Sequence, residues 1–125
     1  MSSEIPLLDE QVLASLREDF ASTGDLGELA AIIRNFLEHA ARELGTIAEA
    51  VADSDAEAAR LAGHKLKGSS LTLGASRLGA AAEQVEAAAA AGDLAAATDA
   101  LRELESVFAL TRASLADVDD PADPS

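Results

Sequence analysis

The sequence predicts an all-α protein, namely an antiparallel four-helix bundle with a short additional N-terminal helix. Apolar residues recur every three or four positions along five successive segments, which is the spacing of one helix face. The composition is rich in alanine and holds only 2% aromatic residues, and alanine loses no side-chain entropy in a helix. The segments are joined by turns of a few residues, so neighbouring helices should run antiparallel.

The first half of the chain holds two of the expected helices. Residues 1–8 are expected to form an N-terminal loop, because Pro6 disfavours an early helix. Asp9 can cap a short helix that runs to about residue 20. After a polar turn, a long amphipathic helix is expected over about residues 26–51. Its apolar face comprises Leu29, Ile32, Ile33, Phe36, Leu37, Leu44, Ile47 and Val51.

Capping residues also define the second half of the chain. Ser54 and Glu57 have the spacing of a capping box, which predicts the start of a third helix. This helix should end at Gly74, since glycine readily adopts the left-handed conformation of a helix stop. Two further helices are expected over about residues 75–91 and, capped by Asp93, to about residue 115. The first of these has an apolar face of Leu78, Ala81, Val85 and Ala88.

Length and charge limit the possible functions. One domain is expected over residues 9–116, followed by a disordered acidic tail over residues 117–125. The net charge of −14 disfavours nucleic acid and membrane surfaces as partners, and no apolar run approaches the roughly 18 residues of a membrane span. The absence of cysteine excludes disulfides and thiolate metal sites. No signal peptide is recognisable, so a cytoplasmic location is expected.

His64 is expected to project from the outer face of the third helix. At about 100° per residue it lies opposite the expected core stripe, which comprises Ala59, Ala62, Leu66, Ser69 and Leu73. The residues within about 60° of His64 in the same projection include Glu57, Arg60, Lys67, Gly68 and Leu71. An exposed imidazole is a nucleophile at neutral pH, and Lys67 could offset the charge of a phosphoryl group on it. Gly68 would let a partner's backbone approach, and Leu71 suits a docking patch.

The charge distribution sets the surroundings of His64 apart from the rest of the chain. Between Ala58 and Ala82 the sequence holds no acidic residue, although the whole chain has 23 Asp and Glu against 9 Lys and Arg. The cations in this window are Arg60, Lys65, Lys67 and Arg77. A basic window in an acidic protein favours an anionic partner pocket at this place.

Residues 62–70, with the sequence Ala-Gly-His-Lys-Leu-Lys-Gly-Ser-Ser, resemble the His-x-x-Lys-Gly-(Ser/Ala) signature of histidine-containing phosphotransfer (HPt) domains. The similarity covers roughly residues 9–115. The resemblance implies a four-helix bundle with an exposed histidine that acts as a phosphorelay intermediate. His64 would accept a phosphoryl group from a receiver-domain phospho-aspartate and transfer it to another response-regulator aspartate.

The resemblance also implies roles for the neighbours of His64. Lys67 matches the lysine beside the phosphate, and Gly68 matches the small residue that follows it. In HPt domains a Gln or Glu on the next helix often holds the histidine ring. Glu86 is at the corresponding position, and Glu83 is the alternative one turn earlier. The family uses a divalent ion, expected to be Mg²⁺, that the receiver holds, so no cofactor or metal is expected on this chain.

The expected partners are response-regulator receiver domains and a histidine kinase, of which a hybrid kinase is one option. No ATP-binding region is recognisable, so the chain is not expected to have kinase activity of its own, and a monomer is expected. Two other functions stay open, namely a helical adaptor that binds a receiver without transfer and a detached phosphoacceptor domain of a histidine kinase. His39 and Lys65 are expected to be ordinary surface residues, and Ser69 is expected to bond a backbone carbonyl.

Overall fold

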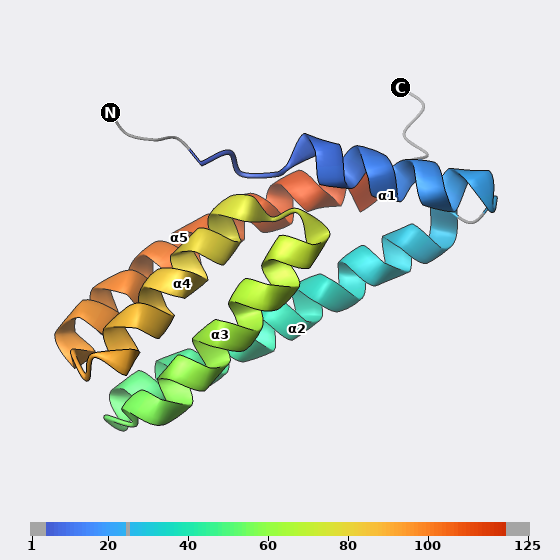
Figure 1. The fold of residues 1–125 in the computed structure, drawn as a ribbon. Helices are drawn as coiled ribbons and strands as arrows, with labels where there is room; N and C mark the ends of the chain where they lie inside the picture. Colours follow the sequence, from blue (N-terminus) through green and yellow to red (C-terminus); the bar gives the residue numbers. More distant parts are fainter. Residues whose placement is uncertain (1–4, 25, 120–125) are drawn as a thin grey trace.

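The computed structural model describes residues 5–24 and 26–119, and in this part of the chain helices account for all regular structure (Figure 1). The helices are α1 (Glu10–Ser22), α2 (Leu26–Ala52), α3 (Ala56–Leu73), α4 (Ser76–Ala90) and α5 (Leu94–Asp119). The predicted all-α class, with a short first helix before four longer ones, is confirmed.

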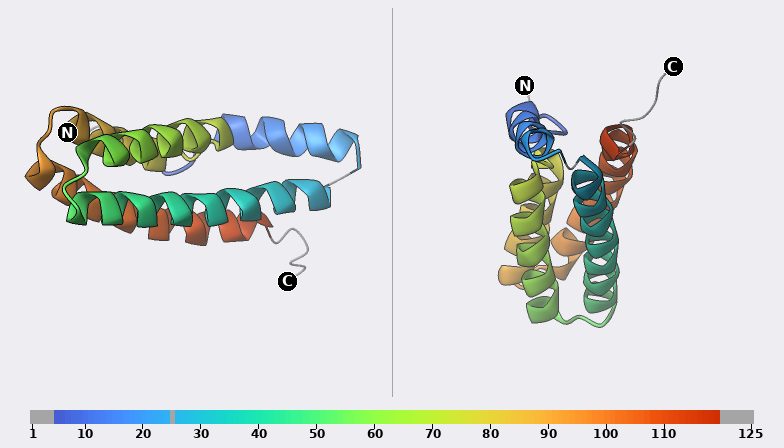
Figure 2. Two further views of the ribbon diagram at one scale, coloured as in Figure 1. Left: turned by 90° about the horizontal axis from the view of Figure 1, so that it is seen from below. Right: turned by 90° about the vertical axis from the view of Figure 1, so that its right-hand side faces the viewer.

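Helices α2 to α5 form the four-helix bundle. Each packs against the next in the chain, and α5 packs back against α2, which closes the bundle. Helix α1 packs against α2 and lies beyond the end of α3 (Figure 2). The long α2 is therefore covered by α3 along one half and by α1 along the other. Helix α3, held between α2 and α4, keeps one face open to solvent.

The cap of α1 agrees with the sequence, whereas the cap of α3 does not. Asp9 Oδ1 accepts hydrogen bonds from the amides of Gln11 and Val12 at 3.0 and 3.2 Å. The expected capping box of Ser54 and Glu57 is wrong, because Asp55 is the N-cap of α3 and accepts from the amide of Ala58 at 3.1 Å.

Ser54 has another role at this turn. Its φ of +57° is left-handed, and the Asp55 amide beyond it donates to the Ala50 carbonyl at 2.7 Å. This is the hydrogen-bonding pattern of a helix C-terminus. Ser54 thus ends α2, and its backbone is not in the extended conformation that an N-cap residue needs.

Gly74 ends α3 as predicted, and the N-terminal segment is tied to the same corner. Gly74 has a φ of +87°, and its carbonyl accepts from the Asp9 amide at 2.7 Å. Arg77 Nε donates to the Ile5 carbonyl at 2.9 Å. Residues 5–9 are non-helical, as expected, and residues 1–4 lie outside the described part. Arg77 was expected among the cations near His64, but its side chain holds the N-terminal segment instead.

Helix α5 is longer than expected. It continues to Asp119 instead of ending near Leu115, so the first three residues of the expected tail are helical. The rest of that expected tail, residues 120–125, lies outside the described residues. No helix in the described part of the chain is both long and apolar enough to cross a membrane.

The core follows the predicted apolar faces with a few differences. Ile33, Ile47, Leu66, Leu78 and Leu104 are all fully buried in one cluster. Five expected core positions are not fully buried: Ile32 is 39% exposed, and Leu37, Val51, Ser69 and Ala88 are partly buried. Ser70 and Ala89, the neighbours of Ser69 and Ala88, are buried instead. In α3 and α4 the buried arc is rotated away from the ideal projection, because α3 packs more extensively against α4 than against α2.

Candidate functional site

His64 lies on the open face of α3, as the helical projection predicts. Its side chain is 61% exposed, while Ala62, Gly63 and Leu66 on the other side of the helix are buried. The ring is therefore in contact with solvent and does not enter the interior of the bundle.

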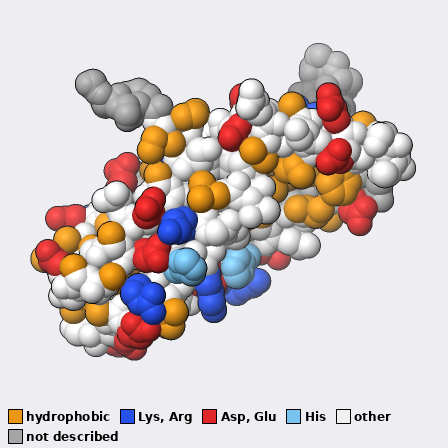
Figure 3. Space-filling model, in the orientation of Figure 1, with side chains coloured by type: hydrophobic (Ala, Val, Ile, Leu, Met, Phe, Trp, Pro, Cys, Tyr) orange, Lys and Arg blue, Asp and Glu red, His pale blue; other side chains and the backbone are white. Residues whose placement is uncertain are grey.

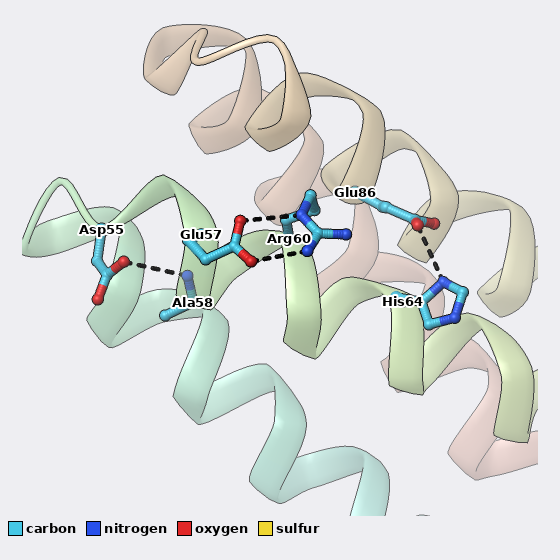
Figure 4. A network of polar contacts seen from close by, with 6 residues as sticks. All are labelled: Asp55, Glu57, Ala58, Arg60, His64 and Glu86. Atoms are coloured by element: carbon cyan, nitrogen blue, oxygen red, sulfur yellow. Dashed lines mark hydrogen bonds and ion pairs between the residues drawn. The ribbon is translucent and has the colours of Figure 1, made fainter.

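Glu86 of α4 holds the His64 ring from one side (Figure 4). His64 Nδ1 lies 2.9 Å from Glu86 Oε2, whereas Glu83 is exposed and one turn away. The structure thus selects Glu86 from the two alternatives. A carboxylate can only accept a hydrogen bond, so Nδ1 carries the hydrogen and the lone pair of Nε2 is free.

Lys67 binds the same carboxylate. Its Nζ lies 3.1 Å from Glu86 Oε1, and its side chain is 26% exposed. The hydrogen bond from Lys67 is the main cause that holds the pKa of Glu86 below its ordinary value of 4.5; burial acts against it, and the hydrogen bond from His64 adds to it. Glu86 is therefore ionised at neutral pH and fixes both His64 and Lys67.

Arg60 is engaged within its own helix. Its Nε and Nη2 donate to the two carboxylate oxygens of Glu57 at 3.0 and 2.7 Å. This two-pronged ion pair lowers the pKa of the Glu57 carboxyl. Glu57, expected to cap the helix, instead holds the guanidinium beside the site. A partner contact by Arg60 stays a prediction, and it would have to share the guanidinium with Glu57.

Gly68 and Leu71 are both exposed on the His64 face. Apart from Gly68 itself, its chain neighbours and the backbone of its own helix, no atom lies within 4 Å of where a Cβ on Gly68 would be, so the backbone is bare there. Leu71 is 52% exposed, and the inner side of its side chain rests on Gly79 of α4. Leu61, which is 46% exposed, was not among the residues expected on this face. Leu61 lies about 60° from His64 in the helical projection, so the criterion that selected Leu71 could have found it.

A shallow groove of about 380 Å³ runs beside this face between α2 and α3. It is lined by Ile32, Asn35, Phe36, His39, Gly68, Ser69, Thr72 and Leu73. His39, expected to be an ordinary surface residue, has a side chain that is 42% exposed and pairs with Glu43 at 3.6 Å. It nonetheless lines the same groove as Gly68, which lies one helical turn after His64 on α3. Ser69 bonds the Leu66 carbonyl at 3.2 Å, as expected.

Charge and apolar surface meet on the face that carries His64. In Figure 3 most of the visible Lys and Arg side chains gather around the two histidines, and an apolar area lies on the same face towards α1. Among the residues that the structure describes, no group of three or more His, Cys, Asp or Glu side chains could hold a metal ion. The reactive groups of the site are therefore one oriented nucleophilic nitrogen, Nε2 of His64, and the fixed ammonium group of Lys67 beside it.

A helical bundle that presents one oriented, exposed imidazole beside a lysine defines the class of histidine phosphotransfer modules. The sequence model of the Hpt domain matches residues 31–118. The chain therefore belongs to the Hpt domain family and is a phosphorelay intermediate of two-component signalling. A search of curated proteins finds no match.

Two solved structures resemble the chain over most of its length. One is histidine-containing phosphotransfer protein B (HptB) from Pseudomonas aeruginosa PAO1, with 28% sequence identity and a TM-score of 0.85, covering 94% of this chain and 98% of that chain. The other is the histidine-containing phosphotransfer protein ZmHP2 from maize, with 22% identity and a TM-score of 0.82, covering 89% of this chain and 81% of that chain. The second likeness is one of fold.

Proposed function

We propose that Nε2 of His64 accepts a phosphoryl group from the phospho-aspartate of one receiver domain and passes it to the aspartate of another. The observation that carries this is the contact between His64 Nδ1 and Glu86, which leaves Nε2 as the nucleophile on an exposed ring. In the step, the Nε2 lone pair forms a bond to phosphorus while the bond from phosphorus to the aspartate oxygen breaks. The carboxylate leaves, and the positive charge on the ring is offset by Glu86.

Lys67 stabilises the phosphoryl group in this proposal. It lies one turn from His64, and its ammonium is already fixed near the ring through Glu86. Phosphoryl transfer needs positioning and charge neutralisation more than covalent chemistry from the protein. Movement of Nζ from Glu86 Oε1 towards a phosphoryl oxygen would exchange one anionic partner for another.

The receiver docks on the apolar and bare surface around His64. Leu61 and Leu71 flank the histidine along α3, and Ile32 adds an exposed side chain from α2. Gly68 lets the receiver backbone come close. Arg60 and Lys67 supply positive charge towards the acidic pocket in which a receiver carries its aspartate and its ion.

The wider setting of the reaction is part of the same proposal. Hpt proteins interact with receiver domains and histidine kinases, and we propose that a hybrid kinase supplies the first receiver. Mg²⁺ is held by the receiver, and this chain acts as a monomer. The exchange takes place in the cytoplasm, with which the lack of cysteine agrees.

The test is transfer of labelled phosphate from a panel of purified phospho-receivers with Mg²⁺. Wild type should acquire an acid-labile phosphoryl group, and His64→Gln should acquire none. Binding of a receiver without labelling would indicate an adaptor instead. Labelling of the pure protein by ATP alone would contradict the absence of kinase activity.

A further inference from the structure

Gly63, immediately before His64, occupies a position where glycine is costly. It lies inside α3 and is buried, and its φ is not positive, so the conformation does not require glycine. Glycine in a helix interior costs about 1 kcal/mol relative to alanine. The reason for glycine must therefore be the space around it.

The space at Gly63 is taken by the backbone of α4. A Cβ added there would meet the Ala82 carbonyl oxygen at 3.2 Å, the Glu86 nitrogen at 3.2 Å and the Glu86 Cα at 3.5 Å. These are backbone atoms of a regular helix, and they cannot rotate away as a side chain can. At Gly79, in contrast, the nearest atoms belong to the flexible side chain of Leu71, and Gly45 and Gly68 have open space.

The residue that Gly63 touches is the one that orients His64. The Cα of Glu86 lies next to Gly63. Its carboxylate oxygens lie 2.9 Å from His64 Nδ1 and 3.1 Å from Lys67 Nζ. We infer that Gly63 is a positioning residue, which sets the distance between α3 and α4 so that Glu86 can hold the His64 ring with Nε2 free. It acts through Glu86 and does not itself touch the phosphoryl group.

A larger residue at position 63 would move the helices apart at this point. For alanine, the α4 backbone must move away from α3 by a few tenths of an ångström. The Glu86 side chain can compensate for only part of this movement. For valine the displacement is greater, and it would lengthen the 2.9 Å hydrogen bond between Glu86 and His64 and the 3.1 Å ion pair between Glu86 and Lys67. A hydrogen bond stretched beyond about 3.2 Å is no longer well formed. The ring would then be released, and the hydrogen would no longer be confined to Nδ1.

The direct test is ¹⁵N NMR of the histidine side chains in wild type, Gly63→Ala and Gly63→Val, with Gly45→Ala as the matched control. The wild type should show His64 with its hydrogen on Nδ1. We expect a partial shift towards the Nε2–H form for Gly63→Ala, a larger one for Gly63→Val and none for Gly45→Ala. The inference would be overturned if a folded Gly63→Val protein gave the wild-type spectrum. It would also be overturned if Gly63→Ala did not fold, because the absence of a side chain at position 63 would then be required for folding alone.

The second readout is a double-mutant cycle in transfer from a phospho-receiver, and this part rests on the proposed function. Gly63→Val should slow transfer about fivefold, as expected for the loss of one hydrogen bond. In a Glu86→Ala background the same substitution should have no further effect, because its action passes through Glu86. Additive losses would contradict this route. Absence of transfer in wild type would refute the proposed function, while the NMR result would still decide the role of Gly63.

Discussion

At the scale of single residues, the site depends on one carboxylate with two partners. Glu86 contributes one oxygen to His64 and the other to Lys67, so it fixes the tautomer of the ring and the place of the ammonium together. The sequence predicted Lys67 beside His64, and the resemblance to HPt domains implied Glu86, or alternatively Glu83, as the partner of the ring. It did not predict that Lys67 would be bound to Glu86, because pairing between side chains of two helices depends on their relative rotation.

Removal of the Lys67 ammonium should slow phosphoryl transfer without loss of the fold. We expect Lys67→Ala to lower the transfer rate at least about tenfold, because one donor to the developing phosphoryl charge is lost. Lys65→Ala is the matched control, since Lys65 is exposed on the same helix but lies about 100° from His64. Rapid-quench measurement with a phospho-receiver gives both rates. Equal rates for Lys67→Ala and wild type would remove the charge role of Lys67.

At the scale of elements, α3 carries the site and its two ends fix its position. Asp55 caps its start, and Gly74 ends it in a left-handed turn that also binds the N-terminal segment. Both residues could be recognised in the sequence as helix-end residues. The assignment of the N-cap to Ser54 failed because two adjacent residues, Ser54 and Asp55, both suit that position. The choice was made by the end of α2, which requires Ser54 to be left-handed.

Substitutions at Ser54 and Asp55 should therefore differ in their effect on stability. Asp55→Ala should lower the free energy of unfolding by about 1 kcal/mol, because an N-cap side chain is lost. Ser54→Gly should leave stability unchanged or raise it by up to about 1 kcal/mol, because glycine adopts a positive φ without strain. Urea unfolding followed by circular dichroism measures both values. A larger loss for Ser54→Gly than for Asp55→Ala would restore Ser54 as the cap.

At the scale of the whole molecule, the bundle gathers the site and a docking surface on one face. Residues from α2 and α3 that are distant in sequence line the groove next to Gly68, and the exposed Leu61, Leu71 and Ile32 lie on these two helices. The Lys and Arg side chains around His64 stand out from an otherwise acidic chain (Figure 3). This combination favours a partner whose contact area is apolar around an anionic centre.

The exposed leucines should contribute to receiver affinity. Leu61→Ala and Leu71→Ala should each raise the Kd for a receiver about three- to tenfold, since each removes apolar area from an interface. Leu110→Ala is the matched control, because Leu110 is 52% exposed, as is Leu71, but belongs to α5. Isothermal titration calorimetry with an unphosphorylated receiver gives the three constants. If Leu110→Ala weakened binding as much as Leu61→Ala, the docking surface would have to be placed elsewhere.

The sequence by itself determined the helical class, most helix ends and the outward direction of His64. These properties are local, because they follow from hydrogen bonding and side-chain periodicity within a few turns of one helix. Tertiary structure alone decided the ion pair of Lys67 with Glu86, the exposure of Ile32 and the close contact at Gly63. Those features depend on how far apart two helices lie and how they are rotated, which is set by the packing of the whole core.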